Sequence, residues 1–266
     1  MVKKIVTHVN PRHLDDTLAV ALLAYKYPEA QIEYIHPQND KEKIEKYLND
    51  SSIICVDIGG KYNPKFKNYD HHQDKNVECS LVLILKHEFP ELYEFIKKHE
   101  ILSKEMKYID IKDRFGLKEA QKLGVSNLFI EEAILLKMAE NPENMQIIGK
   151  AFYDKLNEML QEYKNLQQIE IINYNGYKIA IDKIGIRFTT IVNNLDVDLV
   201  IQRNVFDKSD TSIIKDTSKE KTKNIDFNKL REKYSIKFIH QAGFIAVIAK
   251  SIEELNIKEL IRDILG

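Results

Sequence analysis

Residues 52–60 read Ser-Ile-Ile-Cys-Val-Asp-Ile-Gly-Gly, an almost continuous apolar run that ends in an aspartate and two glycines. A short apolar run of this kind is typical of a strand that is buried on both faces, as in the interior of a parallel sheet. The glycines after Asp57 allow the backbone to approach a ligand closely. The stretch therefore predicts a central strand with a carboxylate at its far end.

The chain before this strand alternates between predicted strands and helices. The four segments are Lys4–Val9 (strand), Leu14–Tyr27 (helix), Gln31–Ile35 (strand) and Lys41–Leu48 (helix). Alternation with short connections predicts an α/β fold with an open, doubly wound, mainly parallel sheet. Ligands of such sheets bind beyond the carboxyl ends of the strands. Because His8 and Asp57 both lie at strand ends, we expect them to face one crevice.

The rest of the chain predicts a helical continuation and then a second domain. Gln146–Gln168 has the length of a helix that connects domains, and Glu170–Ile181 is a predicted hairpin on an Asn-Gly turn. Phe238–Ala249 is mainly apolar, and Ile252–Leu265 is a predicted closing helix. We expect a first domain over residues 1–150, a connecting helix over 151–168 and a smaller α+β domain over 169–266.

Composition limits the kinds of partner. The 266 residues carry 40 basic and 41 acidic side chains, so the global charge does not favour nucleic acid or a membrane surface, and an anionic substrate must meet local charge or metal. No apolar run approaches the length of a membrane span, and the first residues resemble a strand rather than a signal peptide, which predicts a cytoplasmic protein. Cys55 and Cys79, the only cysteines, fall in predicted buried elements, which argues against disulfides and thiolate zinc sites.

Oxygen and imidazole side chains are the remaining metal ligands, and they gather near the predicted strand ends. The candidates are His8, His13, Asp15, Asp57, His71, Asp110 and Asp113. This number exceeds what one tetrahedral zinc ion requires, whereas two octahedral Mn²⁺ or Mg²⁺ ions with a bridging carboxylate use nearly all of them. Asp57, at the end of the longest apolar strand, is the candidate bridge.

Several of these polar residues also have an ordinary structural explanation. Asp16, next to Asp15, would be favoured by the helix dipole in a first helical turn. Asp113 is adjacent to Arg114 and could form a surface ion pair. His240 lies in an apolar run, where histidines are more often hydrogen-bonded core residues. The set of candidates, rather than any single residue, therefore carries the prediction.

Three ordered motifs make the set resemble a known family. Residues 7–16 read THVNPRHLDD, residues 56–60 read VDIGG and residues 69–73 read YDHHQ. Together they resemble the DHH phosphoesterase superfamily and, within it, the melanocyte-proliferating-gene family, a group regarded as 3′-5′ exonucleases. Residues 110–113 resemble that family's fourth acidic motif, and residues 238–245 resemble its C-terminal His-x-x-Gly-Phe segment.

The resemblance implies a first, catalytic and metal-binding lobe and a second, substrate-binding lobe, with an active-site cleft between them. It implies Mn²⁺-dependent hydrolysis of phosphodiester or phosphoanhydride bonds, with ligands at His8, Asp15, Asp57 and His71. His13 stands where many members have a further aspartate, and either Asp110 or Asp113 completes the set. Residues 9–13 and 113–116 depart from the family pattern.

The resemblance also suggests roles for the residues around the metals. We expect Asp57 and His72 to act in catalysis, with His72 stabilising the transition state or assisting proton transfer, and Asp70 supporting a ligand. Residues of the second lobe would clamp a terminal phosphate, and the candidates are Arg187, Arg203, His240 and Gly243. The expected substrate is a short RNA or DNA oligonucleotide or a dinucleotide, and the sequence is compatible with a homodimer.

Two other functions fit the same residues. One is hydrolysis of inorganic pyrophosphate, since the superfamily includes a pyrophosphatase. The other is a regulatory module that binds metal or nucleotide and has lost the chemistry. Turnover of pyrophosphate measured beside turnover of oligonucleotide separates the first alternative, and nucleotide binding without turnover would indicate the second.

Overall fold

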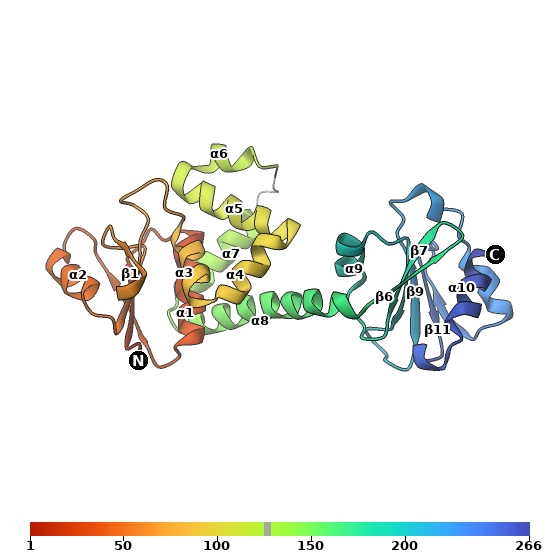
Figure 1. Ribbon diagram of the computed structural model, residues 1–266. Coiled ribbons are helices and arrows are strands. Elements are labelled where there is room, and N and C mark those ends of the chain that lie inside the picture. Colours follow the sequence, from red (N-terminus) through yellow and green to blue (C-terminus); the bar gives the residue numbers. More distant parts are fainter. Residues whose placement is uncertain (125–128) are drawn as a thin grey trace. The chain divides into compact units, whose positions relative to one another are not determined.

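Helix α8 (Asn144–Asn165) contains the boundary between the two units of the chain. The computed structural model describes the backbone of residues 1–124 and 129–266, and the side chains of these residues except 129–131. It divides the chain into residues 1–158 and residues 159–266, each a compact unit (Figure 1). The predicted α/β class is confirmed, whereas the roles expected for the two units stay predictions.

The first unit is built on a sheet of five strands in the order β2-β1-β3-β5-β4. The strands are β1 (Lys4–His8), β2 (Gln31–Ile35), β3 (Ile53–Val56), β4 (Tyr62–Asn63) and β5 (Asn68–Tyr69). β1, β2, β3 and β5 run parallel, and only the short edge strand β4 is antiparallel. The mainly parallel sheet is therefore as predicted, and the β4–β5 pair is an addition that the sequence pattern did not indicate.

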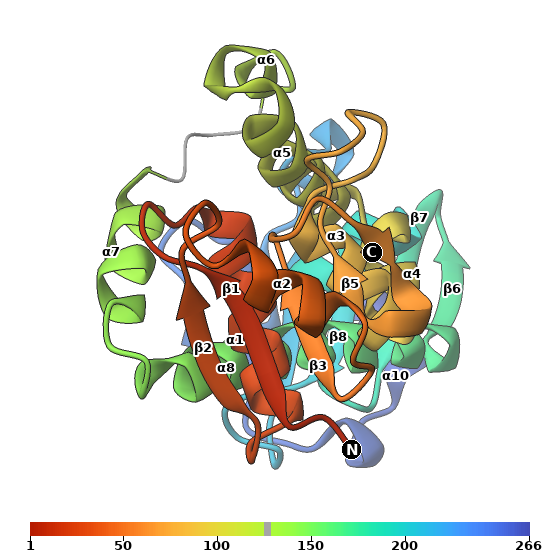
Figure 2. The same ribbon diagram turned by 90° about the vertical axis from the view of Figure 1, so that its left-hand side faces the viewer.

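Helices cover both faces of this sheet, which explains the apolar run of β3. The first three helices are α1 (Leu14–Lys26), α2 (Lys41–Leu48) and α3 (Ser80–Glu88). Val6 and Cys55 pack against Ile44 of α2. Their neighbours Ile5 and Ile54 are fully buried and point to the opposite face, where α1 and α3 lie (Figure 2). The sheet is doubly wound, as expected.

The described residues of the first unit that follow α3 form further helices. They are α4 (Pro90–Lys98), α5 (Glu100–Phe115), α6 (Leu117–Gln121), α7 (Phe129–Ala139) and α8. α5 carries both Asp110 and Asp113, whose spacing of three residues places them on one face of the helix. It ends at Gly116, whose φ of +87° breaks the helical path.

The second unit contains a mixed sheet of six strands in the order β10-β11-β9-β8-β7-β6. Its strands are β6 (Glu170–Tyr174), β7 (Tyr177–Asp182), β8 (Leu199–Arg203), β9 (Thr211–Lys215), β10 (Ile236–Ile239) and β11 (Ile245–Ile248). Beyond the end of α8, the unit has the α-helices α9 (Phe188–Leu195) and α10 (Ile257–Leu265), which lie on opposite sides of this sheet (Figure 1). A short 3-10 helix, η4 (Phe227–Glu232), packs on the α10 side.

The predicted β6–β7 hairpin is confirmed. Asn175 and Gly176 form its turn, and both have a positive φ (47° and 78°), as a two-residue hairpin turn requires. The lysine-rich stretch 208–224, for which the sequence pattern indicates no element, contains β9, and the apolar run 238–249 is divided between β10 and β11. Within residues 1–124 and 129–266, no helix has the length and apolar character to span a membrane.

Candidate metal centre

Three neighbouring parallel strands of the first unit deliver polar residues to one edge of the sheet. His8 is the last residue of β1, Asp57 follows β3 directly, and Asp70, His71 and His72 follow β5. Asp57 has a φ of +54°, an unfavourable conformation for a residue with a Cβ. Such strain is typical of residues that the surrounding structure holds in place for a function.

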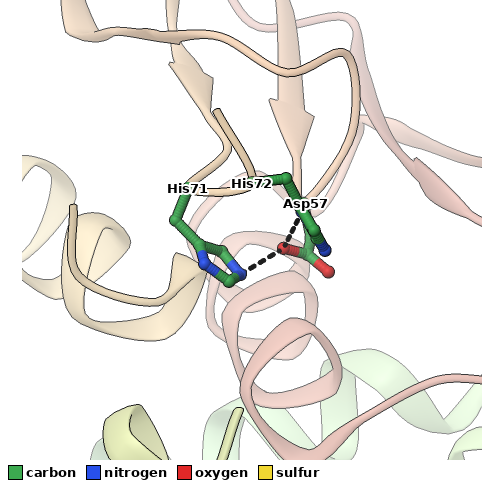
Figure 3. Close-up of side chains that lie close together, drawn as sticks. All are labelled: Asp57, His71 and His72. Carbon is green, nitrogen blue, oxygen red and sulfur yellow. Dashed lines mark ion pairs between the residues drawn. The ribbon is translucent and has the colours of Figure 1, made fainter. Parts of the chain in front are cut away.

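Asp57 is the central residue of the group. Its Oδ1 lies 3.1 Å from His71 Nε2 and its Oδ2 lies 3.3 Å from His8 Nε2 (Figure 3 shows the His71 side). Ser80 Oγ donates a hydrogen bond of 2.9 Å to Oδ1. The side chain is buried, and the contacts with His71 and His8 hold the pKa of its carboxyl below the usual range although burial alone would raise it. Each oxygen faces a different imidazole, an arrangement suited to a bridging ligand.

His8 connects Asp57 with a residue that the sequence left ambiguous. His8 Nδ1 donates to the Val9 carbonyl oxygen at 2.7 Å, so Nε2 faces Asp16 Oδ2 at 3.1 Å as well as Asp57. Burial lowers the pKa of His8, but the two carboxylates outweigh burial and raise it to about 10. Asp16 is in the first turn of α1, where its Oδ1 accepts a hydrogen bond from the His13 backbone. It therefore fulfils the structural role considered for it and also belongs to the cluster.

Helix α5 contributes Asp113 from the other side. Asp113 Oδ2 lies 2.9 Å from His71 Nε2, and Oδ1 lies 3.3 Å from His13 Nδ1. Burial raises the pKa of the Asp113 carboxyl, but the two histidines together outweigh burial, so the net change is downward. The pKa of His71 rises to about 10, because Asp113 and Asp57 outweigh the effect of burial.

Asp15 provides the test of whether a metal ion fits this group. Only 1% of the residue is exposed, and neither carboxylate oxygen has a hydrogen-bond partner among the described residues. Burial, followed by the charges of Asp57 and Asp113, raises the pKa of Asp15 well above its usual range. A buried carboxylate without a partner is costly, and a cation removes that cost. The donor set of carboxylate oxygens and imidazole nitrogens therefore fits a hard or borderline divalent ion.

Two sets of ligand atoms are close enough to hold an ion each. Donor atoms of His8, Asp16 and Asp57 lie within 4.8 Å of one another, and so do donor atoms of His13, Asp15 and Asp113. A third set of the same span is Asp57, His71 and His72.

Asp110, the other candidate of the fourth motif, has different partners. Its Oδ1 accepts hydrogen bonds from the Cys79 backbone at 2.7 Å and from Arg114 Nε at 2.8 Å, and its Oδ2 pairs with the same guanidinium. Asp110 thus links α5 to the start of α3 and is not among the ligand sets of the described residues. Asp113 contacts His71 and His13, whereas Asp110 is bonded to Arg114, so the structure favours Asp113 as the ligand and the assignment stays a prediction.

His72 and His13 are exposed, whereas the side chains of His8 and His71 are largely buried. The His72 side chain is 61% exposed, and its Nδ1 lies 2.8 Å from Asp70 Oδ1. The backbone of Gly60 donates to the second oxygen of Asp70 at 2.6 Å, so the carboxylate is fixed on both sides. The bond with Asp70 raises the pKa of His72. Asp70 therefore supports His72, and its predicted role of holding a ligand in place stays a prediction.

A pocket of about 410 Å³ opens over this part of the cluster. His8, Asp57 and His72 line it together with the glycine pair 59–60. A side chain at residue 59 would place its Cβ 2.9 Å from Leu48 at a φ of +95°, so only glycine fits there. The pocket gives a substrate access to the buried carboxylates.

The predicted substrate residues all belong to the second unit. Arg187 Nε donates to Glu162 at 2.8 Å, and Arg203 forms an ion pair with Glu253. His240 and Gly243 lie in the turn between β10 and β11, where His240 Nδ1 accepts a hydrogen bond from the Ala242 backbone. Their joint action on a phosphate stays a prediction.

Two solved structures align with most of this chain at low similarity. The pGpG-specific phosphodiesterase PggH from Vibrio cholerae aligns over 99% of this chain and 98% of its own, with 16% identity and a TM-score of 0.34. RecJ from Thermus thermophilus, in complex with Mn²⁺, aligns over 98% of this chain and 51% of its own, with 12% identity and a TM-score of 0.31. These scores are too low to support a conclusion about fold or function.

The sequence comparisons concern the segment that forms the cluster. The mouse (Mus musculus) MYG1 exonuclease is 41% identical over 70 residues, and the human (Homo sapiens) protein is 41% identical over 75 residues. These matches cover 26% and 28% of this chain but only 17% and 18% of the relatives. Residues 4–80 match the profile of MYG1_exonuc, described as uncharacterised protein family UPF0160. The resemblance predicted from the motifs is thus confirmed over residues 4–80, which match the MYG1 exonuclease family.

Proposed function

We propose that this chain is a metal-dependent phosphoesterase that hydrolyses phosphodiester bonds of short nucleic acids or dinucleotides, as a 3′-5′ exonuclease. The observation that carries the proposal is the buried Asp15 carboxylate, which has no partner among the described residues and lies in a cluster of further carboxylates and imidazoles. The family match over residues 4–80 supports a nuclease. The aligned segment spans about a sixth of the curated relatives, so their activity comes to this chain as a proposal.

The cluster would hold two ions, Mn²⁺ or Mg²⁺, and carboxylate oxygens suit both. One ion would be held by the set His8, Asp16 and Asp57, and the other by the set His13, Asp15 and Asp113. His71 lies between Asp57 and Asp113 and would join the two sets. When bound, such ions supply hydroxide from water near neutral pH and neutralise the charge that develops on the phosphoryl oxygens.

His72 is positioned to act on the substrate. Because Nδ1 bonds to Asp70, the free Nε2 is the ring nitrogen available to the pocket. The bond with Asp70 raises the pKa of His72 and so favours the protonated ring. His72 can therefore donate a hydrogen bond to a phosphoryl oxygen and give its proton to the leaving oxygen. Asp70 positions the ring through its bond to Nδ1.

The test is the release of mononucleotides from short oligonucleotides with Mn²⁺. Asp57→Asn removes the charge that lies between His8 and His71, and we expect a loss of at least about a hundredfold in rate. Asp74→Asn is the matched control, because Asp74 is exposed and bonds only with residues of its own turn. Equal rates for the wild type and Asp57→Asn would contradict the proposal.

The same assay separates the other functions. Pyrophosphate turnover that exceeds oligonucleotide turnover would indicate a phosphoanhydride hydrolase. Nucleotide binding without turnover under any divalent ion would indicate a regulatory module. Oligonucleotides labelled at the 5′ end test the direction, since a 3′-5′ exonuclease yields a ladder of shortened labelled products and a 5′-3′ enzyme yields a labelled mononucleotide first.

A further inference from the structure

One face of the second-unit sheet is only partly covered. Ile201 and Ile213 point to the side that α10 and η4 cover, and both are fully buried there. On the other side, α9 packs with Val200 in a separate core cluster. Because side chains alternate along a strand, Gln202 shares this second side with Val200, and the strand register places Ser212 beside it.

A pocket of about 640 Å³ lies on this side, beyond the part that α9 covers. Gln202, Ser212 and Val247 line it from the sheet, and Phe206 and Phe238 line it from the β8–β9 loop and β10. Phe206 is 95% exposed and Phe238 is 48% exposed. Two exposed phenylalanine rings at one pocket of this size are typical of a binding site rather than of a core.

Gln202 gives the pocket its polar group. The residue is only 2% exposed, and its Oε1 has no hydrogen-bond partner among the described residues. A buried amide oxygen without a partner costs free energy, and a ligand with hydrogen-bonding groups at its edge satisfies it. The primary amide can offer both a donor and an acceptor to such an edge.

The charges at the rim are already compensated. Lys237 Nζ lies 2.7 Å from Asp210 and 3.5 Å from Asp207, and the Arg187 guanidinium is bonded to Glu162. The pocket thus offers a phosphate no uncompensated cation among these rim residues. It fits an uncharged flat ring with polar edges better than an anionic group.

We propose that this pocket binds a nucleobase, with the ring against Phe206 and Phe238 and its edge on the amide of Gln202. The pocket would fit several flat rings with polar edges. That the ring is a nucleobase rests on the proposed function, hydrolysis of nucleic acids or dinucleotides. Stacking on aromatic side chains tolerates all four bases, so the pocket would add affinity without strong sequence preference. The second unit would then recognise the base, and the phosphate would be recognised elsewhere.

The first test measures binding of adenosine 5′-monophosphate to the full chain in EDTA, by calorimetry, with ribose 5-phosphate as the probe that lacks the base. The wild type should bind the nucleotide more tightly than the sugar phosphate. Phe206→Leu keeps an apolar side chain but removes the ring, and it should weaken nucleotide binding roughly tenfold. Gln202→Leu should weaken it as well, whereas Ile171→Ala on the far edge strand β6 should not change it. Equal affinity for the two probes in the wild type, or unchanged binding by Phe206→Leu, would overturn the proposal.

A second measurement separates this proposal from the proposed function. With Mn²⁺ and a dinucleotide substrate, Phe206→Leu should raise KM roughly tenfold, and Ile171→Ala should leave KM as in the wild type. If the wild type binds the nucleotide as expected in EDTA but cleaves nothing with Mn²⁺, the proposed function fails and the base site stands. If the wild type cleaves and Phe206→Leu has the wild-type KM, the base site fails and the proposed function stands.

Discussion

Two buried acidic residues of the first unit, Glu88 and Asp15, have opposite surroundings. Glu88 Oε2 accepts hydrogen bonds from Lys26 at 2.8 Å and Tyr27 at 2.7 Å, and its Oε1 accepts one from Tyr69 at 3.0 Å. Asp15 has no such partner among the described residues for either oxygen. The pKa values move accordingly: burial raises both, but Lys26 and Tyr27 reverse the effect at Glu88, so that its pKa is lowered, whereas that of Asp15 is raised.

Glu88 stabilises the fold through its hydrogen bonds. Asp15 has the surroundings expected of a carboxylate that binds a cation. Removing Glu88 would leave an ammonium group and two hydroxyls without their partner. Removing the charge of Asp15 leaves no hydrogen-bonding group unpaired among the described residues. Burial alone therefore does not distinguish a functional acid from a structural one. The lack of hydrogen-bond partners for a buried carboxylate does.

Asp15→Asn gives the largest expected effect. It should weaken Mn²⁺ binding by about a hundredfold or more, because an amide oxygen is a poorer ligand than a carboxylate. The same change should raise the melting temperature of the metal-free protein, since a buried charge without a partner is removed. Calorimetric titration with Mn²⁺ and thermal unfolding in EDTA measure the two effects. If metal-free Asp15→Asn were less stable than the metal-free wild type, Asp15 would stabilise the fold as Glu88 does, and the proposed difference between them would be wrong.

Glu88→Gln should behave in the opposite way. We expect it to lower the free energy of unfolding by about 3 kcal/mol, because it breaks a buried ion pair with Lys26. Denaturant unfolding in EDTA measures this change. The increase in melting temperature that Mn²⁺ produces should equal that of the wild type, because Glu88 lies outside the ligand sets of the described residues. If Mn²⁺ no longer raised the melting temperature of Glu88→Gln, metal binding would depend on Glu88, which would contradict the account.

The pH dependence should also differ between the two regions. The lowered pKa of Glu88 means that its stabilisation is fully present above the unfolded value, about 4.5, and is lost as the pH falls through the lower folded value. Glu88→Gln should therefore flatten the acid limb of a plot of stability against pH. In the metal centre, the pKa of about 10 at His8 and His71 means that Mn²⁺ must displace protons, so its affinity should rise with pH. Titrations in buffers of different ionisation enthalpy count these protons, and an affinity that falls with rising pH would contradict the assignment.

Ser80→Ala should have the smallest effect. Ser80 Oγ donates to Asp57 at 2.9 Å and to the Tyr69 carbonyl at 3.0 Å, so it orients the central carboxylate without being a ligand. We expect Mn²⁺ affinity to fall about tenfold, as is usual for groups that hold a ligand in place. A loss as large as that of Asp15→Asn would mean that Ser80 does more than orient Asp57.

Much of the first unit could be predicted because its pattern is local. Gln31–Ile35 and Lys41–Leu48 have the predicted bounds, and His8 and Asp57 meet because parallel strands end at one edge of the sheet. Asp16 was left undecided since its position in a first helical turn explains it equally well. Asp110 and Asp113 lie on one helical face, and only their tertiary contacts, Arg114 and Cys79 with Asp110 and the two histidines with Asp113, distinguish them.

The second unit was harder to predict because its pairing is not local. β9 is short and lies in a lysine-rich stretch, and its apolar residues Ile213 and Ile214 are recognisable only beside β8 and β11. The apolar run that contains β10 and β11 turns at His240–Gly243, where Gly243 has a φ of +66°. The pocket at Gln202 depends on which part of the sheet α9 leaves uncovered, and spacing in the sequence does not show that.

Anomalous scattering from a crystal soaked in Mn²⁺ tests the central claim most directly. We predict peaks at coordination distance from Asp57, Asp15 and Asp113, and none at Asp110 or Glu88. One peak beside His8, Asp16 and Asp57 and a second beside His13, Asp15 and Asp113 would match the two-ion proposal. A peak at Asp110, or no peak beside Asp15, would contradict the conclusion that the carboxylate without a partner marks the metal centre.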